Sequence, residues 1–357
     1  MSSNCDFFNF IVWGVIVSCL CCFGFVGNIL SLLAFARERR VPALTLLQCL
    51  ASSDLVLLLS VFITDSLPYL CDHTDQCANP WKTWPYVRYM WIMTPISHMS
   101  SIWFVVLIAL NRYWAVCRPH SLSTVWTNQR TPIYVSCVLV LVVSFNVPRF
   151  FEYQIIDVYD NSTNCTRLME QNTDFGLTPS YKVIYKVMLV NILLIMLPIA
   201  ALIICTGLIV YGLRTQRRRM NSQRTASNKE RSPSAKARGH GARAASEITF
   251  VLVVVVVVAI ICQSPLAAFH FVRYSQRYRC GDFVYYLDNI SKLLVNVNSC
   301  INFVIYCVAS PKFRTVLLAL VSCDNEQEKV RPASSIVSDG KRDLITRNGS
   351  HVRDTNL

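Results

Sequence analysis

The residues with the clearest chemical potential are one acid and several amides and hydroxyls that lie within long apolar stretches. Asp54 interrupts an otherwise uncharged stretch from Val41 to Thr64. A carboxylate removed from water needs hydrogen-bond donors or a counter-ion. Oxygen ligands could hold a sodium ion at Asp54; alternatively, the same groups form a hydrogen-bonded cluster around a protonated Asp54, and the sequence leaves both open. The predicted cluster consists of Asn28, Asp54, Ser101, Asn298, Ser299 and Asn302.

The chain has seven long sequence segments that contain almost no charged residues, which we call windows, and these polar groups lie within them. The 357 residues are 53% hydrophobic and only 15% charged, whereas a soluble domain carries about 25% charged residues. This deficit excludes a disordered chain and an ordinary soluble enzyme. Each window is long enough for a helix that crosses a hydrocarbon core of about 30 Å. We therefore predict an all-α membrane protein, a seven-transmembrane helix bundle with helices at about 7–36, 41–69, 85–117, 131–151, 183–214, 246–273 and 284–309.

The basic residues predict the orientation of this bundle. Most of the 34 Lys and Arg residues lie in alternate segments between the windows, above all from Arg214 to Glu247. The positive-inside rule then places the N-terminus outside and the C-terminus in the cytoplasm of a multi-pass plasma-membrane protein. The net charge of +13 thus indicates a basic face beside anionic membrane lipid, not a nucleic-acid partner. Predicted domains are an extracellular N-terminus (1–6), the transmembrane domain (7–311) and a disordered cytoplasmic tail (324–357).

A short amphipathic eighth helix is predicted on the cytoplasmic face at 312–323. Five apolar residues there follow the spacing of one helix face, as in helices that lie on a lipid surface. Cys323 at its end is either a palmitoylation site or a free thiol. The repeating residues are Phe313, Val316, Leu317, Leu320 and Val321.

The predicted outer segments contain candidates for two covalent modifications. Asn161 and Asn164 each begin an Asn-X-Ser/Thr triplet and are expected glycosylation sites. A disulfide from Cys165 to Cys77 or Cys71 would fix the second outer loop, but connectivity cannot be deduced from sequence. The outer cysteines are odd in number: Cys5, Cys71, Cys77, Cys165 and Cys280.

Short motifs in six of the seven windows occur in an order that resembles rhodopsin-like G-protein-coupled receptors. Residues 146–152 and 298–303 resemble more narrowly the invertebrate FMRFamide-receptor-like branch. The resemblance implies a receptor without catalysis or a required cofactor, with an extracellular peptide ligand, a heterotrimeric G protein, arrestin and receptor kinases as partners. The motifs are Gly27-Asn28, 50–55 (LASSDL), Asn111-Arg112-Tyr113, Pro198, Cys262-Gln263-Ser264-Pro265 and 302–306 (NFVIY).

The chain also departs from the pattern of that family. Asn111 replaces the acid that precedes Arg112, Gln263 replaces a Trp, Phe303 replaces a Pro, and Val87 stands where a Cys is usual. The resemblance implies that helix six swings outward at a kink at Pro265, while Arg112 joins Tyr306. Because Asn111 cannot form an ion pair, we expect a less firmly held resting state. From spacing alone, Arg112 could instead be an arginine whose charge reaches the membrane surface.

Two residues that some receptors of that family use to bind their ligands are missing here, and this restricts the expected class of ligand. Thr94 occupies the position of the acid that amine receptors use, and Asn296 that of the retinal-binding lysine, which favours a peptide. An Arg-Phe-amide end needs a carboxylate and an aromatic slot. The open alternatives are another neuropeptide, a small ligand or a seven-helix transporter, although no internal repeat supports a transporter. Candidate ligand residues are Asp65 and Asp288, with Glu152 and Asp282 behind them, and Trp91, His98, Phe269 and Tyr285.

Overall fold

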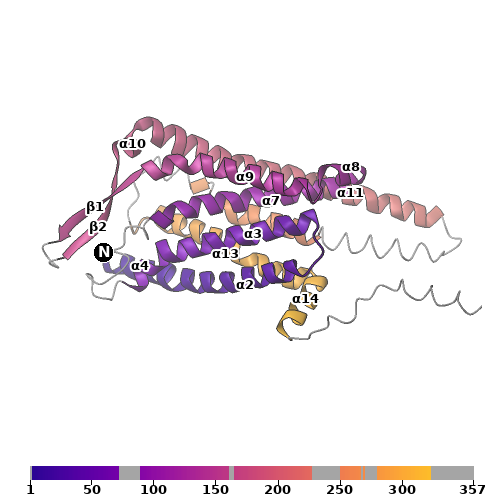
Figure 1. The fold of residues 1–357 in the computed structure, drawn as a ribbon, viewed down its shortest axis with the longest axis horizontal. Helices are drawn as coiled ribbons and strands as arrows, with labels where there is room; N and C mark the ends of the chain where they lie inside the picture. The colour runs from indigo at the N-terminus through magenta and orange to yellow at the C-terminus, as the bar shows by residue number, and fades with distance from the viewer. Residues whose placement is uncertain are drawn as a thin grey trace, which may run out of the picture. The chain divides into compact units, whose positions relative to one another are not determined.

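A computed structural model describes residues 2–71, 89–160, 165–226, 250–266, 268–269 and 280–322. Long helices lie side by side in a bundle within one compact unit, Met1–Leu317, and Leu318–Leu357 form a second unit (Figure 1). Six described helices are long and apolar enough to cross a membrane, and the described part of a further helix, Phe250–Leu266, is shorter. The prediction of an all-helical bundle with membrane-spanning helices is therefore confirmed.

Several of the long helices combine an α-helix with a π-helical or 3-10 segment. The first is α1 (Ser2–Asn9), η1 (Phe10–Val17) and α2 (Ser18–Ala36), and the second is α3 (Pro42–Val61), η2 (Phe62–Ser66) and α4 (Leu67–Leu70). Then follow η3 (Tyr89–Ile92), α7 (Met93–Cys117), α8 (Pro119–Val125), α9 (Arg130–Asn146) and η4 (Val147–Phe151). The rest are β1 (Tyr153–Asp160), β2 (Cys165–Asn172), α10 (Asp174–Leu177), η5 (Tyr181–Leu189), η6 (Asn191–Met196), α11 (Leu197–Ala226), α13 (Phe283–Ala309) and α14 (Pro311–Val321).

Proline residues define several helix starts. Pro42, Pro119 and Pro311 lie at the beginning of α3, α8 and α14, where a missing backbone N–H costs nothing. The residue before a proline avoids helical backbone angles. Ser310 accordingly has φ −117° and ψ 101° and separates α13 from α14.

Two helix boundaries differ from the predicted ones. The first helix already begins at Ser2, so most of the segment predicted as a separate N-terminus is helical. The helix predicted to end near residue 214 continues to Ala226. Charge marks where lipid ends, but backbone hydrogen bonding can continue beyond it, and Arg, Gln and Met are good helix formers.

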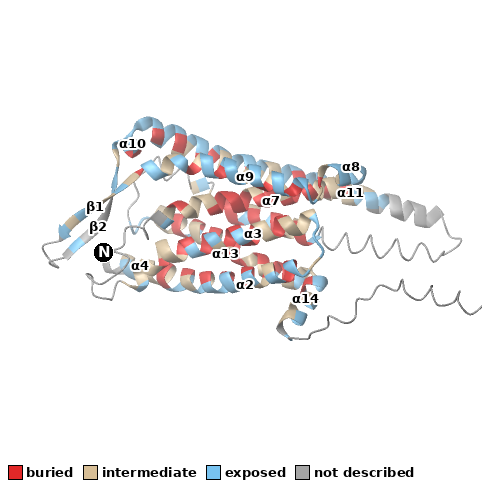
Figure 2. Cartoon of the chain, in the orientation of Figure 1, coloured by how far each residue is buried: buried red, intermediate tan, exposed pale blue. Residues whose placement is uncertain are grey.

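The helix α7 lies at the centre of the bundle. In its apolar window 67% of the residues are buried, compared with 11% in α9, which lies at the periphery (Figure 2). Around α7 pack α3, α9 and α11, while α2 packs against both α3 and α13. This arrangement brings the polar residues of α3, α7 and α13 toward one interior.

Two glycines allow α2 to approach α13 closely. A Cβ atom on Gly24 would lie 2.5 Å from Sγ of Cys300, and one on Gly27 would lie 2.9 Å from Cβ of Phe303. Small residues at such crossings let helices in lipid pack backbone to backbone. The Gly27-Asn28 motif thus has a packing role as well as a polar one.

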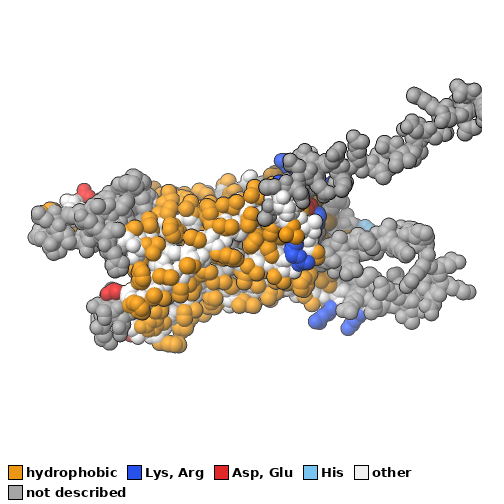
Figure 3. All heavy atoms as spheres, turned by 90° about the horizontal axis from the view of Figure 1, so that it is seen from below, with side chains coloured by type: hydrophobic (Ala, Val, Ile, Leu, Met, Phe, Trp, Pro, Cys, Tyr) orange, Lys and Arg blue, Asp and Glu red, His pale blue; other side chains and the backbone are white. Residues whose placement is uncertain are grey.

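The outside of the bundle is apolar between its two ends. Large hydrophobic residues such as Leu33, Leu141 and Ile204 are exposed, and hydrophobic side chains cover the middle of the visible face (Figure 3). Blue Lys and Arg side chains lie toward one end of this band (Figure 3). An apolar belt between polar ends is typical of a surface that meets lipid.

A two-stranded antiparallel hairpin was not predicted. Strands β1 and β2 pair from Tyr153 opposite Asn172 to Asp160 opposite Cys165. The sequence does contain a pattern that favours a strand here, because Ile155, Ile156 and Val158 are β-branched residues of high strand propensity. The hairpin lies at the same end of the bundle as the N-terminus, which we call the disulfide end; α14 begins at the opposite, α14 end (Figure 1).

Candidate functional site

The Asp54 carboxylate joins three helices in the interior of the bundle. Asp54 in α3 has no exposed surface. Oγ of Ser101 in α7 donates a hydrogen bond to one carboxylate oxygen at 2.8 Å, and Nδ2 of Asn302 in α13 donates to the other at 2.9 Å. Both carboxylate oxygens are therefore held by neutral donors.

The other predicted members of this cluster lie nearby in the fold but do not all reach the carboxylate. Nδ2 of Asn28 donates to the backbone oxygens of Gly24 and Ser299, at 2.8 and 3.0 Å. Asn298 is buried, but within the described ranges no hydrogen bond links it or Asn28 to Asp54. Oδ1 of Asn28 is buried without a hydrogen-bond partner, and the buried Ser299 hydroxyl lies close enough to interact with the Asp54 carboxylate.

The oxygen atoms of this cluster are of the kind that bind a small hard cation. Such an ion prefers carboxylate, hydroxyl and amide oxygens. Asp54 supplies the negative charge, while Ser299 lies three residues before Asn302 on the same helix face and presents its hydroxyl to Asp54. In the described part of the chain no group of three or more His, Cys, Asp or Glu side chains could hold a metal ion.

The arginine motif lies near the α14 end without an ion pair. Asn111 is buried, and Nε of Arg112 is buried without a hydrogen-bond partner. The Tyr113 ring packs edge-on against Trp114. Tyr306 is buried among aromatic rings, with centroids 5.3 Å from Phe35 and 5.6 Å from Phe313. The absence of an acid at position 111 therefore leaves Arg112 without a partner among the described residues.

A hydrogen bond links α7 to the Phe250–Leu266 helix. Nε2 of His98 lies 3.1 Å from Oε1 of Gln263, and both side chains are buried. Since an amide oxygen only accepts, the histidine donates from Nε2. Cys262 beside Gln263 is also buried, and Pro265 lies in the same described stretch of helix. Sequence reasoning placed His98 in an aromatic slot and missed this contact.

A cavity of about 740 Å³ opens toward the disulfide end. Four of the predicted ligand residues line it: Asp65, His98, Tyr285 and Asp288. Trp91 does not, because its ring packs edge-on against Tyr153 of β1, with centroids 5.2 Å apart. Phe269 is likewise absent from the lining.

The charges around this cavity are mixed. Lys292 forms an ion pair with Asp288, N to O 2.7 Å, and its charge also acts on Asp65. Arg149 lines the cavity and its buried Nε has no hydrogen-bond partner. Neither basic residue was predicted as a site residue, because the sequence does not show which cations face the cavity.

Glu152, a second-rank acidic candidate, is occupied by the protein itself. It is buried, accepts a hydrogen bond from Tyr181 at 2.8 Å and forms an ion pair with Lys186. Nζ of Lys186 also lies over the Tyr153 ring. Glu152 therefore anchors the start of β1 to the helix that begins at Tyr181 and does not line the cavity.

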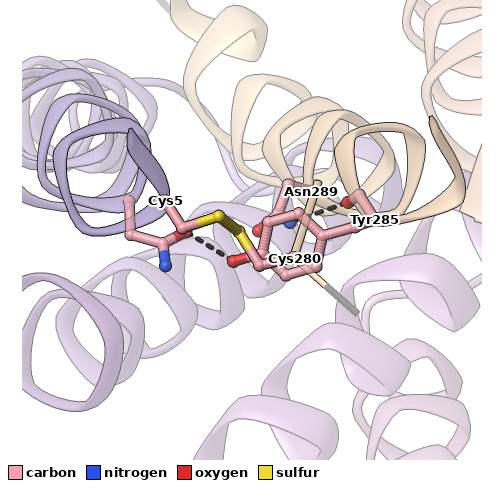
Figure 4. Close-up of a disulfide and its surroundings, with 5 residues drawn as sticks. Cys5, Cys280, Tyr285 and Asn289 are labelled. Atoms are coloured by element: carbon pink, nitrogen blue, oxygen red, sulfur yellow. Dashed lines mark hydrogen bonds between the residues drawn. A yellow bond between two sulfur atoms is a disulfide. The ribbon is translucent and has the colours of Figure 1, made fainter. Parts of the chain in front are cut away.

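A disulfide ties the first helix to the start of α13 (Figure 4). Cys5 is bonded to Cys280, the hydroxyl of Tyr285 donates to Oδ1 of Asn9 at 2.6 Å, and the Trp13 indole donates to Asn289 at 2.8 Å. Asn9, Trp13, Tyr285 and Asn289 all line the cavity. This clamp therefore forms one wall of the candidate ligand site.

Loss of this disulfide should lower thermal stability. Removing a native disulfide typically costs about 2–4 kcal/mol, so reductant should lower the unfolding midpoint of the purified wild type and of Cys19→Ser. Cys19 is an exposed free cysteine in α2 and serves as the control. A Cys5→Ser, Cys280→Ser double variant should already unfold at a lower temperature, and reductant should lower its midpoint less than it lowers that of the wild type. Equal sensitivity of all three proteins would refute the clamp.

Some predicted positions lie outside the described residues: Cys77, Val87, Asn161, Asn164, Cys323 and the tail 324–357. Cys165 begins β2. The expected pairing of Cys165 with Cys77 or Cys71 stays a prediction, as do glycosylation and palmitoylation. The Cys5–Cys280 bridge was not predicted, because sequence does not show which cysteines meet.

Comparison with known proteins settles the family. Residues 27–306 match the family described as 7 transmembrane receptor (rhodopsin family). The chain belongs to this family. It is therefore a multi-pass membrane receptor and not an enzyme, and the predicted resemblance to rhodopsin-like G-protein-coupled receptors is confirmed.

The receptor is similar to several peptide receptors at low identity. It is 24% identical over 322 residues to the FMRFamide receptor of Drosophila melanogaster, covering 87% of this chain and 54% of that protein. It is 28% identical over 353 residues to the FMRFamide peptide receptor frpr-18 of Caenorhabditis elegans, covering 92% and 76%. It is 27% identical over 312 residues to the human B1 bradykinin receptor, covering 83% and 78%. The resemblance to the FMRFamide-receptor branch is thus confirmed.

Proposed function

We propose that this chain is a plasma-membrane receptor for an amidated neuropeptide of the FMRFamide type, with the disulfide end outside the cell. Binding in the 740 Å³ cavity would activate heterotrimeric G proteins at the α14 end. The observation that carries this proposal is the cavity itself, in which acids and aromatic rings face one space. The names of two relatives support the ligand class.

The proposed orientation follows from the charges. Arg37 and Arg118 directly follow α2 and α7, and Arg130 is the first residue of α9, so these basic residues lie at the same end of the bundle. An excess of Lys and Arg at one end favours the cytoplasmic side for that end. By the same reasoning α14 would lie on the inner membrane surface, and arrestin and receptor kinases would act there.

The path from ligand to G protein would run through the His98–Gln263 hydrogen bond. His98 lines the cavity, and Gln263 belongs to the helix that must swing outward. A ligand that displaces His98 would release this helix and shift the population toward the open packing. Pro265 provides a backbone position without an N–H donor, at which the helix can bend.

The Asp54 cluster would tune this equilibrium. Asp54, Ser101 and Ser299 are the residues that would hold a sodium ion, with Asn302 as a neighbour. A bound cation would neutralise the carboxylate and favour the packing in which α3, α7 and α13 converge on it.

Removing the Asp65 charge should selectively weaken peptides that carry arginine. A charge-assisted hydrogen bond is worth about 1.5–3 kcal/mol, so Asp65→Asn should raise the half-maximal concentration of an Arg-Phe-amide peptide about tenfold to a hundredfold. Citrulline in place of arginine should impose the same loss on the wild type and no further loss on the variant. Asp157→Asn in the exposed face of β1 is the control. Wild-type potency of the arginine peptide on Asp65→Asn, or a further loss with the citrulline peptide on that variant, would contradict the assignment.

Breaking the His98–Gln263 bond should raise signalling without ligand. A buried neutral hydrogen bond contributes about 1 kcal/mol, which corresponds to about a fivefold change in the open population. Gln263→Leu and His98→Phe should each raise basal nucleotide exchange, and the double variant should add little to either. Additive effects, or unchanged basal exchange, would show that this contact does not restrain the helix.

A second candidate ligand class is a peptide with a free carboxyl end. Arg149 lines the cavity with an unpartnered Nε, which suits a carboxylate. Amidated and free-acid forms of each peptide, screened together by calcium and cAMP responses, separate the two classes. A preference for the free acid that Arg149→Gln abolishes would favour the second class.

A further inference from the structure

A second cavity, of about 460 Å³, lies near the α14 end of the bundle. It is distinct from the ligand cavity, because the two share no lining residue. Its walls come from α2, α3, α7, the Phe250–Leu266 helix, α13 and the first residues of α14. The walls are mainly apolar and include Phe35, Leu47, Val251, Leu252, Tyr306 and Phe313.

One cation in this apolar lining has a buried nitrogen and no counter-ion among the described residues. Arg112 lines the cavity, its Nε is buried, and no ion pair or hydrogen bond to it occurs in the described segments. The only acid among the lining residues is Glu38, which forms an ion pair with Lys312. Arg112 is half-buried, and a guanidinium partly withdrawn from water gains from a counter-ion. The cavity is therefore built to gain from an anion.

The shape and charge of the cavity together restrict the occupant. A volume of this size suits one small molecule, and apolar walls suit a hydrocarbon chain, which gains about 0.8 kcal/mol per buried methylene. The planar guanidinium matches a carboxylate with two parallel hydrogen bonds. Exposed Arg39 and Lys312 mark the polar edge, where the cavity meets solvent.

We propose that this cavity binds a long-chain fatty acid, with its carboxylate on Arg112 and its hydrocarbon chain against the apolar walls. The bound carboxylate takes the place of the acid that is missing at position 111. The fatty acid thus provides Arg112 with the counter-ion that the neutral Asn111 side chain cannot provide. Binding of the fatty acid does not depend on the identity of the peptide or on coupling to G proteins.

The test is saturable binding of radiolabelled oleate to the purified full-length receptor in phosphatidylcholine nanodiscs, after subtraction of empty nanodiscs. We expect one saturable site that methyl oleate, which has no charge, does not compete for. Arg112→Gln should weaken oleate binding about tenfold or more, because a hydrogen bond to a charged group is lost. Arg118→Gln, an exposed arginine at the end of the same helix, should bind like the wild type.

Two further variants protect the test against misfolding. Asn111→Asp adds an internal counter-ion and should weaken oleate binding while the thermal unfolding midpoint stays the same or rises. Leu47→Trp should fill the cavity and abolish binding in a receptor that still unfolds cooperatively. Equal competition by methyl oleate, tighter binding of lysophosphatidate with no saturable oleate site, or unchanged binding in Arg112→Gln would overturn the proposal.

Discussion

Replacing Asp54 by leucine should strongly destabilise the receptor. The variant leaves the Ser101 hydroxyl and the Asn302 amide without their acceptor in a buried site. Each orphaned buried polar group costs about 1–3 kcal/mol, so the total loss is about 2–6 kcal/mol. Because α3, α7 and α13 meet at this carboxylate, their relative packing should loosen as well. Thermal unfolding of the purified receptor measures the loss.

A matched control lies on the same helix. Ser60 is buried in α3, but its hydroxyl donates only to the carbonyl of Val56 one turn earlier, at 2.7 Å. Ser60→Ala should therefore change the unfolding midpoint little. Asp54→Asn keeps one acceptor oxygen and should lie between the wild type and Asp54→Leu. If Asp54→Leu unfolds at the wild-type temperature, the carboxylate does not hold the three helices together.

Restoring an acid beside Arg112 should silence the receptor in the absence of ligand. In the structure Asn111 is buried and Arg112 has a buried Nε without a partner. Asn111→Asp places a carboxylate where an ion pair with Arg112 can form. A partly buried pair is worth about 1 kcal/mol or somewhat more, and basal nucleotide exchange should fall about fivefold to tenfold.

The control for this variant is Asn111→Ala. It removes the amide without adding charge, so it should not lower basal exchange. Surface expression must be matched between the variants, since less protein in the membrane would imitate silencing. Equal basal exchange in the wild type and Asn111→Asp would show that Arg112 does not restrain the resting packing.

The membrane bundle could be predicted from the sequence because lipid imposes a simple rule on composition. Any stretch that crosses the hydrocarbon core must exclude charge and satisfy its backbone internally, so the charge-poor windows reveal the helices. Asp54 stood out for the same reason. Ser101 and Asn302 donate hydrogen bonds to its carboxylate. In an apolar surrounding, few other hydrogen-bond partners are available to these three polar side chains.

Contacts that depend on the relative rotation of helices could not be predicted in this way. His98 bonds to Gln263, Trp91 turns toward the hairpin, and Glu152 is buried between Tyr181 and Lys186. Each outcome depends on which face of a helix meets its neighbour. The disulfide between residues 5 and 280 likewise depends on how the ends of the first helix and α13 are arranged.

The central claim is that a peptide in the cavity at the disulfide end drives a G protein at the α14 end. Its most direct test is nucleotide exchange by a purified G-protein heterotrimer, mixed with the full-length receptor and a panel of amidated peptides. We predict a saturable rise in exchange with a peptide ending in Arg-Phe-amide, and a half-maximal peptide concentration about tenfold to a hundredfold higher in Asp65→Asn. Stimulation by small amines alone, with no response to any peptide, would contradict the account.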